Sequence, residues 1–96
     1  MAQAAGDMMI QYSPGFIKKL RKLHVRIRKS FKEKIQIFEK NPYDLQLENH
    51  TLEREYEGLR SINLTSDYRA IYEEINEGEE VVVYFLLLGT HKELYG

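Results

Sequence analysis

The stretch VVVYFLLL, residues 81–88, is a continuous apolar run rich in β-branched and aromatic side chains. A short run of this kind, bounded by turn residues, is typical of a buried strand. The stretch NEGE, residues 76–79, is a turn signal directly before it, and residues 69–75 before the turn alternate as a second strand. We therefore expect residues 81–88 to form the central strand of a sheet and to follow residues 69–75 in a hairpin.

Upstream of these strands, the apolar residues recur at helical spacing. A first helix is predicted after Ser13-Pro14, where serine can cap a helix and proline can occupy its first turn. A second helix is predicted over residues 25–40 and ends at Asn41-Pro42. The apolar positions of the two helices are Phe16, Ile17, Leu20, Leu23, Ile27, Phe31, Ile35 and Phe38.

Two further strands are predicted, at residues 8–12 and at residues 59–64. The order is then βααβββ, which predicts an α+β fold with a two-helix hairpin packed on one face of a mostly antiparallel sheet. Residues 1–7 are expected to be a flexible N-terminal tail, and residues 8–96 a single domain.

Composition limits the kinds of site that this chain can build. The 96 residues, 43% of them hydrophobic, are enough for one core. The chain has no cysteine, which excludes disulfides, thiolate metal sites and a thiol nucleophile and favours a reducing cytoplasm. No apolar stretch approaches the roughly 18–20 residues that span a bilayer. We expect a soluble, cytoplasmic protein with no membrane partner.

Positive and negative charges are segregated along the chain, although the formal net charge is only −1. Residues 13–40 contain ten Lys and Arg against two Glu, whereas residues 41–96 contain four basic against twelve acidic residues. This pattern favours a polyanionic partner for the helical half, such as a nucleic acid backbone, over an ordinary solvated surface. The basic residues expected to bind it are Lys18, Lys19, Arg21, Lys22, Arg26, Arg28, Lys29 and Lys32.

Three histidines are the only imidazoles, and their spacing has no metal-site signature, so we expect neither a metal nor a cofactor. His24 falls at the junction of the two helices, where a surface histidine favoured by the helix dipole is the simpler interpretation. His50 precedes the sheet and His91 follows its last strand, so the fold could bring both to one edge. Taken singly, each is more often a solvated loop histidine than a catalyst.

Asp67 and Arg69 are two positions apart, so at the start of a strand they would point to the same face. A carboxylate that orients or receives a proton would then lie beside a guanidinium that can bind phosphate in a fork. A purely structural Asp–Arg pair on an exposed face is the alternative. Tyr95 near the chain end completes the candidate set.

Three stretches together resemble the RelE/ParE superfamily of toxins from bacterial type II toxin–antitoxin systems. They are LENHTLEREYEGLRSINL (47–64), DYRAIY (67–72) and GTHKELYG (89–96). The last stretch is most similar to the YafQ-type branch, whose members also end in a Gly-Thr/Ser-His motif followed by Leu, an aromatic residue and Gly. The resemblance covers residues 8–96.

This resemblance implies a metal-independent endoribonuclease that cuts mRNA in the ribosomal A site and is held inactive by a cognate antitoxin. The positions that match the active-site residues of these toxins are His50, Asp67, Arg69, His91 and Tyr95. One departure concerns Asn63, which stands where YafQ-type proteins often carry a further histidine. Which group acts as general base is therefore left open.

The chemistry that such a reaction needs is present in these residues. RNA can be cut by its own 2′-hydroxyl when one group removes that proton, another protonates the departing 5′-oxygen and a cation stabilises the charge at phosphorus. We expect His50 and Asp67 on the base side and His91 as the acid. Arg69 is expected to bind the phosphate and Tyr95 to stack on a base of the codon. The basic helices would then hold 16S rRNA.

The chain end has its own prediction. Gly89 is expected to let the backbone turn, so that His91 and Tyr95 face the substrate. In the alternative, Leu94 and Tyr95 cover the edge of the core and His91 is solvated.

Two other functions stay open. ParE-like members of the same fold inhibit DNA gyrase without being nucleases; the presence of His50 together with His91 argues against this function. A catalytically inactive toxin fold that only binds an antitoxin or RNA is the second alternative, and Asn63 is the residue that keeps it open.

Overall fold

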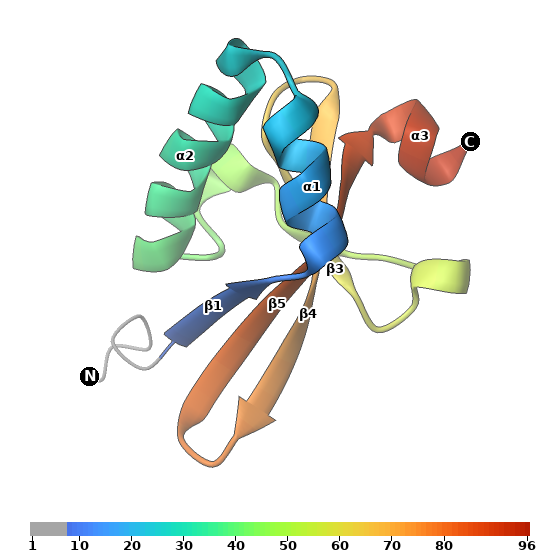
Figure 1. Ribbon diagram of the computed structural model, residues 1–96. Helices are drawn as coiled ribbons and strands as arrows, with labels where there is room; N and C mark the ends of the chain where they lie inside the picture. The colour runs from blue at the N-terminus through green and yellow to red at the C-terminus, as the bar shows by residue number, and fades with distance from the viewer. Residues whose placement is uncertain (1–7) are drawn as a thin grey trace.

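The computed structural model describes residues 8–96, and Figure 1 shows two helices lying against one side of a twisted sheet. The strands are β1 (Met8–Tyr12), β2 (His50–Thr51), β3 (Arg60–Asn63), β4 (Tyr68–Glu77) and β5 (Glu80–Thr90). The helices are α1 (Pro14–Lys22), α2 (Val25–Lys40) and α3 (His91–Tyr95), with 3₁₀ turns η2 (Leu45–Leu47) and η3 (Arg54–Tyr56). The tail predicted at residues 1–7 lies outside the described residues. Within residues 8–96, no helix has the length and apolar character needed to cross a membrane.

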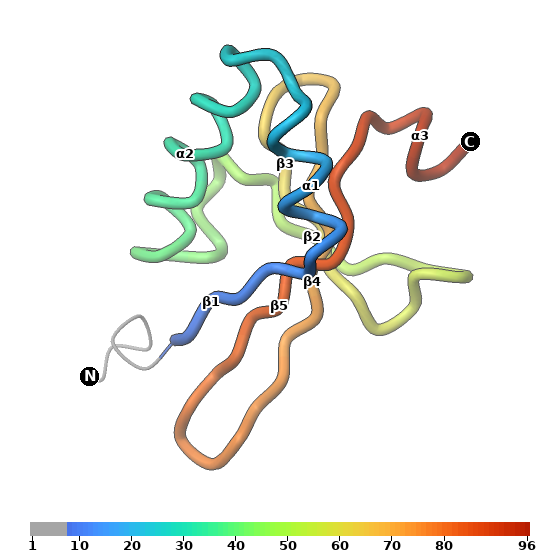
Figure 2. The backbone as a smooth tube through the Cα atoms, in the orientation of Figure 1, coloured from blue at the N-terminus to red at the C-terminus, as the bar shows by residue number. Residues whose placement is uncertain are grey.

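The five strands form one sheet in the order β1-β5-β4-β3-β2. β1 runs parallel to β5, and all other neighbours are antiparallel. β4 and β5 form a long hairpin that extends away from the helices, as the backbone trace in Figure 2 shows. The hairpin closes through Gly78 and Glu79, and Gly78 has a φ of 65°, in the left-handed region that favours glycine. The predicted α+β class with a mostly antiparallel sheet is confirmed.

The predicted βααβββ order lacks two short elements that the structure contains. β2 has only two residues and lies at the sheet edge, so it is too short to show an alternating pattern. α3 has five residues, and its sequence signal is the capping box formed by Thr90 and Glu93. The prediction that residues 81–88 form the central strand is also wrong. These residues belong to β5, which is internal, but β4 occupies the middle of the sheet because both β3 and β2 lie beyond it.

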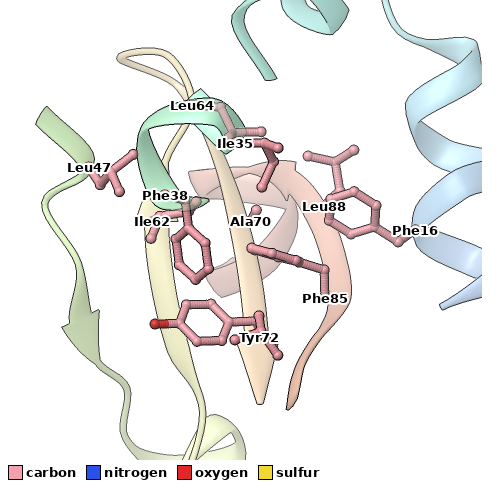
Figure 3. Close-up of a cluster of buried hydrophobic side chains, with 11 residues drawn as sticks. Phe16, Ile35, Phe38, Leu47, Ile62, Leu64, Ala70, Tyr72, Phe85 and Leu88 are labelled. Carbon is pink, nitrogen blue, oxygen red and sulfur yellow. The ribbon is translucent and has the colours of Figure 1, made fainter. Parts of the chain in front are cut away.

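The two helices cover one face of the sheet because their apolar stripes carry large side chains of the core. Phe16 of α1 and Phe38 of α2 are 1% and 0% exposed. Phe38 meets the ring of Tyr72 on β4 edge-on at 5.2 Å between ring centroids, and Phe85 of β5 lies 5.5 Å from Phe38. Figure 3 shows these aromatic rings packed together over β4 and β5. Because aromatic side chains bury a large apolar area, this cluster is a main source of stability.

A β-bulge in β5 sets which side chains reach each face of the sheet. Tyr72 pairs with Phe85, but the preceding Ile71 pairs with Leu87, so Leu86 is an extra residue on β5. Such a bulge shifts the alternation of the strand by one position. The side chains on either side of it therefore follow different registers.

The consequence appears at the end of β5. Phe85 and Leu88 are three residues apart, yet both face the core. Beyond the bulge, Gly89 pairs with Arg69, which in turn pairs with Asn63 on β3. Because side chains alternate along strands, this row lies on the face opposite the helices.

Replacing Phe38 by Ala tests the core. The variant should lose about 3–5 kcal/mol of unfolding free energy, because a fully buried ring is removed and the rigid sheet cannot refill the space. Leu45→Ala is the control, since Leu45 is 91% exposed and should change stability by less than about 0.5 kcal/mol. Urea denaturation measures both values; equal losses in the two variants would contradict the assignment of Phe38 to the core.

Candidate active site

A cleft of about 370 Å³ opens on the sheet face opposite the helices. Its walls come from β2 and the residues on either side of it, the end of β3, the start of β4 and the helix α3. The residues that line it are Glu48, His50, Leu52, Asn63, Arg69, His91 and Tyr95. Four residues of the predicted site, all except Asp67, are therefore brought together, and Asn63 lies with them.

Asp67 lies beside the cleft rather than in its lining. It belongs to the loop before β4, which begins only at Tyr68, so the alternation of a strand does not apply to it. Its amide donates to Thr65 Oγ1 at 3.2 Å, and its carbonyl accepts the amide hydrogen of His91 at 3.0 Å. Asp67 thus contacts the site through its main chain, and its side chain is exposed.

Arg69 projects from β4 into the cleft, and its guanidinium is held by main-chain carbonyls. Nη1 donates to the carbonyls of Thr65 and Ser66, each at 3.2 Å. Among residues 8–96, Lys19–Glu93 is the only ion pair, so the structural Asp67–Arg69 pair considered above does not form. The guanidinium keeps its charge available to an anion.

His50 lies on the short edge strand β2, opposite Ser61 of β3. Its Nδ1 lies 2.9 Å from the carbonyl oxygen of Glu48. A carbonyl can only accept, so Nδ1 carries the hydrogen in this contact. In the neutral ring, Nε2 is then the unprotonated nitrogen, which is the form a general base requires.

His91 and Tyr95 are the first and last residues of α3, and their rings pack together with centroids 4.7 Å apart. Tyr95 also meets Tyr56 of η3 edge-on at 5.6 Å, and the Tyr56 hydroxyl donates to the carbonyl of Leu94 at 2.7 Å. Tyr95 is still 37% exposed. The contacts of Tyr56 with Tyr95 and Leu94 hold α3 in place, while His91 and part of Tyr95 stay accessible to solvent.

Gly89 is needed for a different reason from the predicted one. It continues β5 in extended conformation, and the strand ends at Thr90. A Cβ built on Gly89 would lie 2.9 Å from Glu93 Oε1 and 3.4 Å from Leu94 Cδ2. The expectation that Gly89 turns the backbone is therefore wrong; the absence of a Cβ instead leaves room for the Glu93 carboxylate, which is held there by the Thr90 amide.

Glu93 fixes the start of α3 and ties it to α1. Its carboxylate accepts the Thr90 amide at 2.9 Å and pairs with the Lys19 ammonium at 3.0 Å. The Thr90 amide, followed by Lys19, lowers the pKa of Glu93 below its ordinary value. Through this carboxylate, the helix that carries His91 is connected to the helical hairpin.

The basic residues of the helices lie on the other side of the sheet from the cleft. Lys19 is half-buried in its pair with Glu93. The other seven are exposed, and Arg28 donates through Nη1 to the Arg21 carbonyl at 3.2 Å. The positive surface of α1 and α2 and the cleft are thus separate, and they approach each other at the Lys19–Glu93 contact.

Two cleft residues, Glu48 and Leu52, carry no motif that would single them out. Glu48 has a φ of 49°, a left-handed conformation that no periodicity predicts for a glutamate. Leu52 is half-buried, and its apolar side chain in a polar connection was the one available signal. Within residues 8–96, no group of three His, Asp or Glu side chains is arranged to hold a metal ion.

Solved structures of toxins share this fold. YafQ from Escherichia coli strain BL21(DE3) matches with a TM-score of 0.65 at 23% identity, covering 91% of this chain and 97% of YafQ. A YoeB/ParE toxin from Agrobacterium tumefaciens gives a TM-score of 0.71 at 15% identity, with 88% and 99% covered. The archaeal RelE–RelB complex from Pyrococcus horikoshii matches with a TM-score of 0.68 at 25% identity, covering 88% of this chain and 94% of the matched chain. The fold is that of the RelE/ParE superfamily of toxins, as the sequence resemblance predicted.

The sequence match is more specific. The family model for the ParE toxin of type II toxin–antitoxin system, parDE, matches residues 10–95. The chain belongs to this family and is a toxin of a type II toxin–antitoxin system. No curated protein gives a significant match to the sequence.

Glu93→Gln tests the electrostatic anchor of α3. Glutamine can still accept the Thr90 amide hydrogen, so the exchange isolates the charge. Because the pKa of Glu93 is lowered on folding, its charge stabilises the native state above the ordinary value of 4.5. This contribution is lost as the pH falls through the lower native value.

Urea unfolding of both proteins between about pH 3 and pH 7 measures the difference. We expect the unmodified protein to be more stable near neutrality and the two curves to converge in acid. Lys19→Met should remove part of the same pH dependence. Parallel curves for the unmodified protein and Glu93→Gln would contradict the assignment.

Proposed function

We propose that this toxin is a metal-independent endoribonuclease of the YafQ type, which cuts mRNA in the ribosomal A site. The observation that carries the proposal is the cleft in which His50, Arg69 and His91 meet. Two imidazoles can divide the roles of base and acid near neutral pH, and a guanidinium can stabilise a phosphorane.

In the proposed reaction, His50 Nε2 removes the proton of the RNA 2′-hydroxyl, and the 2′-oxygen attacks the adjacent phosphorus. Arg69 donates to the non-bridging phosphate oxygens as their negative charge increases. His91, protonated, gives its proton to the departing 5′-oxygen. The bond between phosphorus and the 5′-oxygen breaks, leaving a 2′,3′-cyclic phosphate and a 5′-hydroxyl.

Two further residues support the same cleft. The exposed part of Tyr95 offers a ring on which a base of the codon can stack. The role of the Asp67 carboxylate on the base side stays a prediction. The Asp67 carbonyl accepts the amide hydrogen of His91 and so helps to position that residue. Asn63 occupies the place of a further histidine and can contribute amide hydrogen bonds but no proton transfer.

The proposed partners are ribosomal RNA, mRNA and a cognate antitoxin, all met in the cytoplasm. Relatives of the same fold have been solved as toxin–antitoxin complexes, including E. coli DinJ–YafQ and the P. horikoshii RelE–RelB complex. The exposed basic residues on α1 and α2 are suited to the backbone of 16S rRNA.

Inhibition of DNA gyrase is the second candidate, and the family match favours it, because the matched model describes a ParE toxin. A gyrase inhibitor would not need two histidines at one cleft, which is why we rank it second. A toxin fold that only binds its partners is the remaining alternative. A supercoiling assay with purified gyrase distinguishes a gyrase inhibitor from a nuclease.

His91→Ala tests the nuclease. Cleavage of a defined mRNA on translating ribosomes should fall by more than about tenfold, because the leaving oxygen loses its acid. Mapping of 5′ ends with and without ribosomes measures the effect. His24→Asn is the control, because His24 caps α2 through Nδ1 at 3.0 Å and asparagine can replace that cap. An unchanged rate for His91→Ala would contradict the mechanism.

The basic surface has a separate test. A triple variant with Lys22, Arg26 and Lys29 replaced by Ala should bind ribosomes roughly tenfold more weakly or worse, with a reduced dependence on salt. Lys40→Ala, an exposed basic residue at the end of α2, is the control and should bind normally. Sedimentation with ribosomes at two salt concentrations gives the measurement. Equal binding by the triple variant would make these residues an ordinary solvated surface.

A further inference from the structure

We propose that Asn49 is a positioning residue that holds His50 in the cleft with Nε2 unprotonated. Asn49 directly precedes His50, but its side chain points away from the cleft lining and into a hydrogen-bond network. The step that it supports, removal of the 2′-hydroxyl proton, rests on the proposed nuclease function. The geometry that Asn49 imposes on His50 does not depend on the nuclease function.

The side chain of Asn49 makes three hydrogen bonds to three different parts of the chain. Nδ2 donates to the Pro42 carbonyl at 2.9 Å and to the Tyr72 hydroxyl at 2.8 Å. Oδ1 accepts from Arg60 Nε at 2.8 Å. Because the Pro42 carbonyl can only accept, the orientation of the amide is determined. Both amide hydrogens and the carbonyl oxygen are therefore used.

The partners of Asn49 are themselves rigid. Tyr72 is 1% exposed and packs between Phe38 and Phe85, with ring centroids 5.2 Å from each. Arg60 lies opposite Tyr72 in the β3–β4 register, and its guanidinium lies 5.2 Å above the ring of Tyr43. We call these three hydrogen bonds of Asn49, to Pro42, Tyr72 and Arg60, the clamp. The clamp attaches the loop before β2 to the middle of the sheet.

Glu48 connects this clamp to the imidazole. It has a φ of 49° and a ψ of 46°, a left-handed conformation that is uncommon for a residue other than glycine. Fully buried Leu47 lies on one side of it and the clamped Asn49 on the other. This conformation turns the Glu48 carbonyl toward His50 Nδ1, at 2.9 Å. Asn49 therefore stabilises the backbone that selects the Nδ1–H tautomer.

Asn49→Ala removes the clamp without altering a residue of the cleft. The ¹⁵N spectrum of the His50 ring, recorded near about pH 8 where imidazole is neutral, reports which nitrogen carries the hydrogen. In the unmodified protein we expect Nδ1–H. In Asn49→Ala we expect a shift toward Nε2–H, the tautomer that a free histidine side chain favours in water.

Kinetics give the second readout. For Asn49→Ala, kcat for mRNA cleavage should fall at least about fivefold while KM changes less than about twofold, because the base is misaligned but the binding surfaces remain. Asn76→Ala is the matched control: Asn76 is an exposed asparagine near the hairpin turn, and both readouts should stay unchanged.

Tyr72→Phe keeps the experiment decisive if Asn49→Ala does not fold. It removes one acceptor of the clamp and keeps the buried ring, so a smaller tautomer shift in the same direction is expected. A folded Asn49→Ala with the tautomer and kcat of the unmodified protein overturns the proposal. Absence of cleavage by the unmodified protein overturns the nuclease function instead, while the ¹⁵N spectrum still tests the role of Asn49.

Discussion

The pairing of β4 with β5 around the bulge at Leu86 is the constraint on which the rest of the structure depends. On one face it places Tyr72 and Phe85 beneath the helices, where they join the aromatic core. On the other face it leaves Arg69 beside Gly89, so that α3 begins directly at the cleft. A slip of one residue would exchange the faces of every side chain beyond it. The same β4–β5 register therefore determines both which side chains form the core and which side chains line the cleft.

The two histidines of the cleft reach it through different kinds of support. His50 lies on an edge strand, and its ring is oriented by the Glu48 carbonyl and by the loop that Asn49 clamps. His91 opens a short helix, with its main-chain amide on Asp67 and its ring against Tyr95. One imidazole thus has a main-chain acceptor at Nδ1, whereas the other is positioned by its backbone and an aromatic neighbour. The nuclease mechanism proposed above uses this asymmetry, because it assigns the base to His50 and the acid to His91.

Charge is separated in space as well as along the chain. The cations of α1 and α2 lie on the far side of the sheet from the cleft, and the β4–β5 hairpin carries acidic residues. Lys19 and Glu93 join the two halves at α3. If the helices bind ribosomal RNA as proposed, the codon must approach past this helix. The capping residues of α3 would then influence both the stability of the toxin and the access of its substrate.

The sequence by itself determined the helical hairpin and the long β4–β5 pair, and it predicted which residues form the candidate site, because periodicity, caps and motifs are local properties. It placed His50, Arg69, His91 and Tyr95 together through family resemblance, and the structure brings these four to one cleft. Other features needed the tertiary structure: the exclusion of Asp67 from the lining, the packing of α3 against Gly89, the left-handed Glu48 and the hydrogen bonds of Asn49. Each of these depends on contacts between segments distant in sequence, such as Asn49 with Tyr72, and no local pattern records which distant atoms will meet.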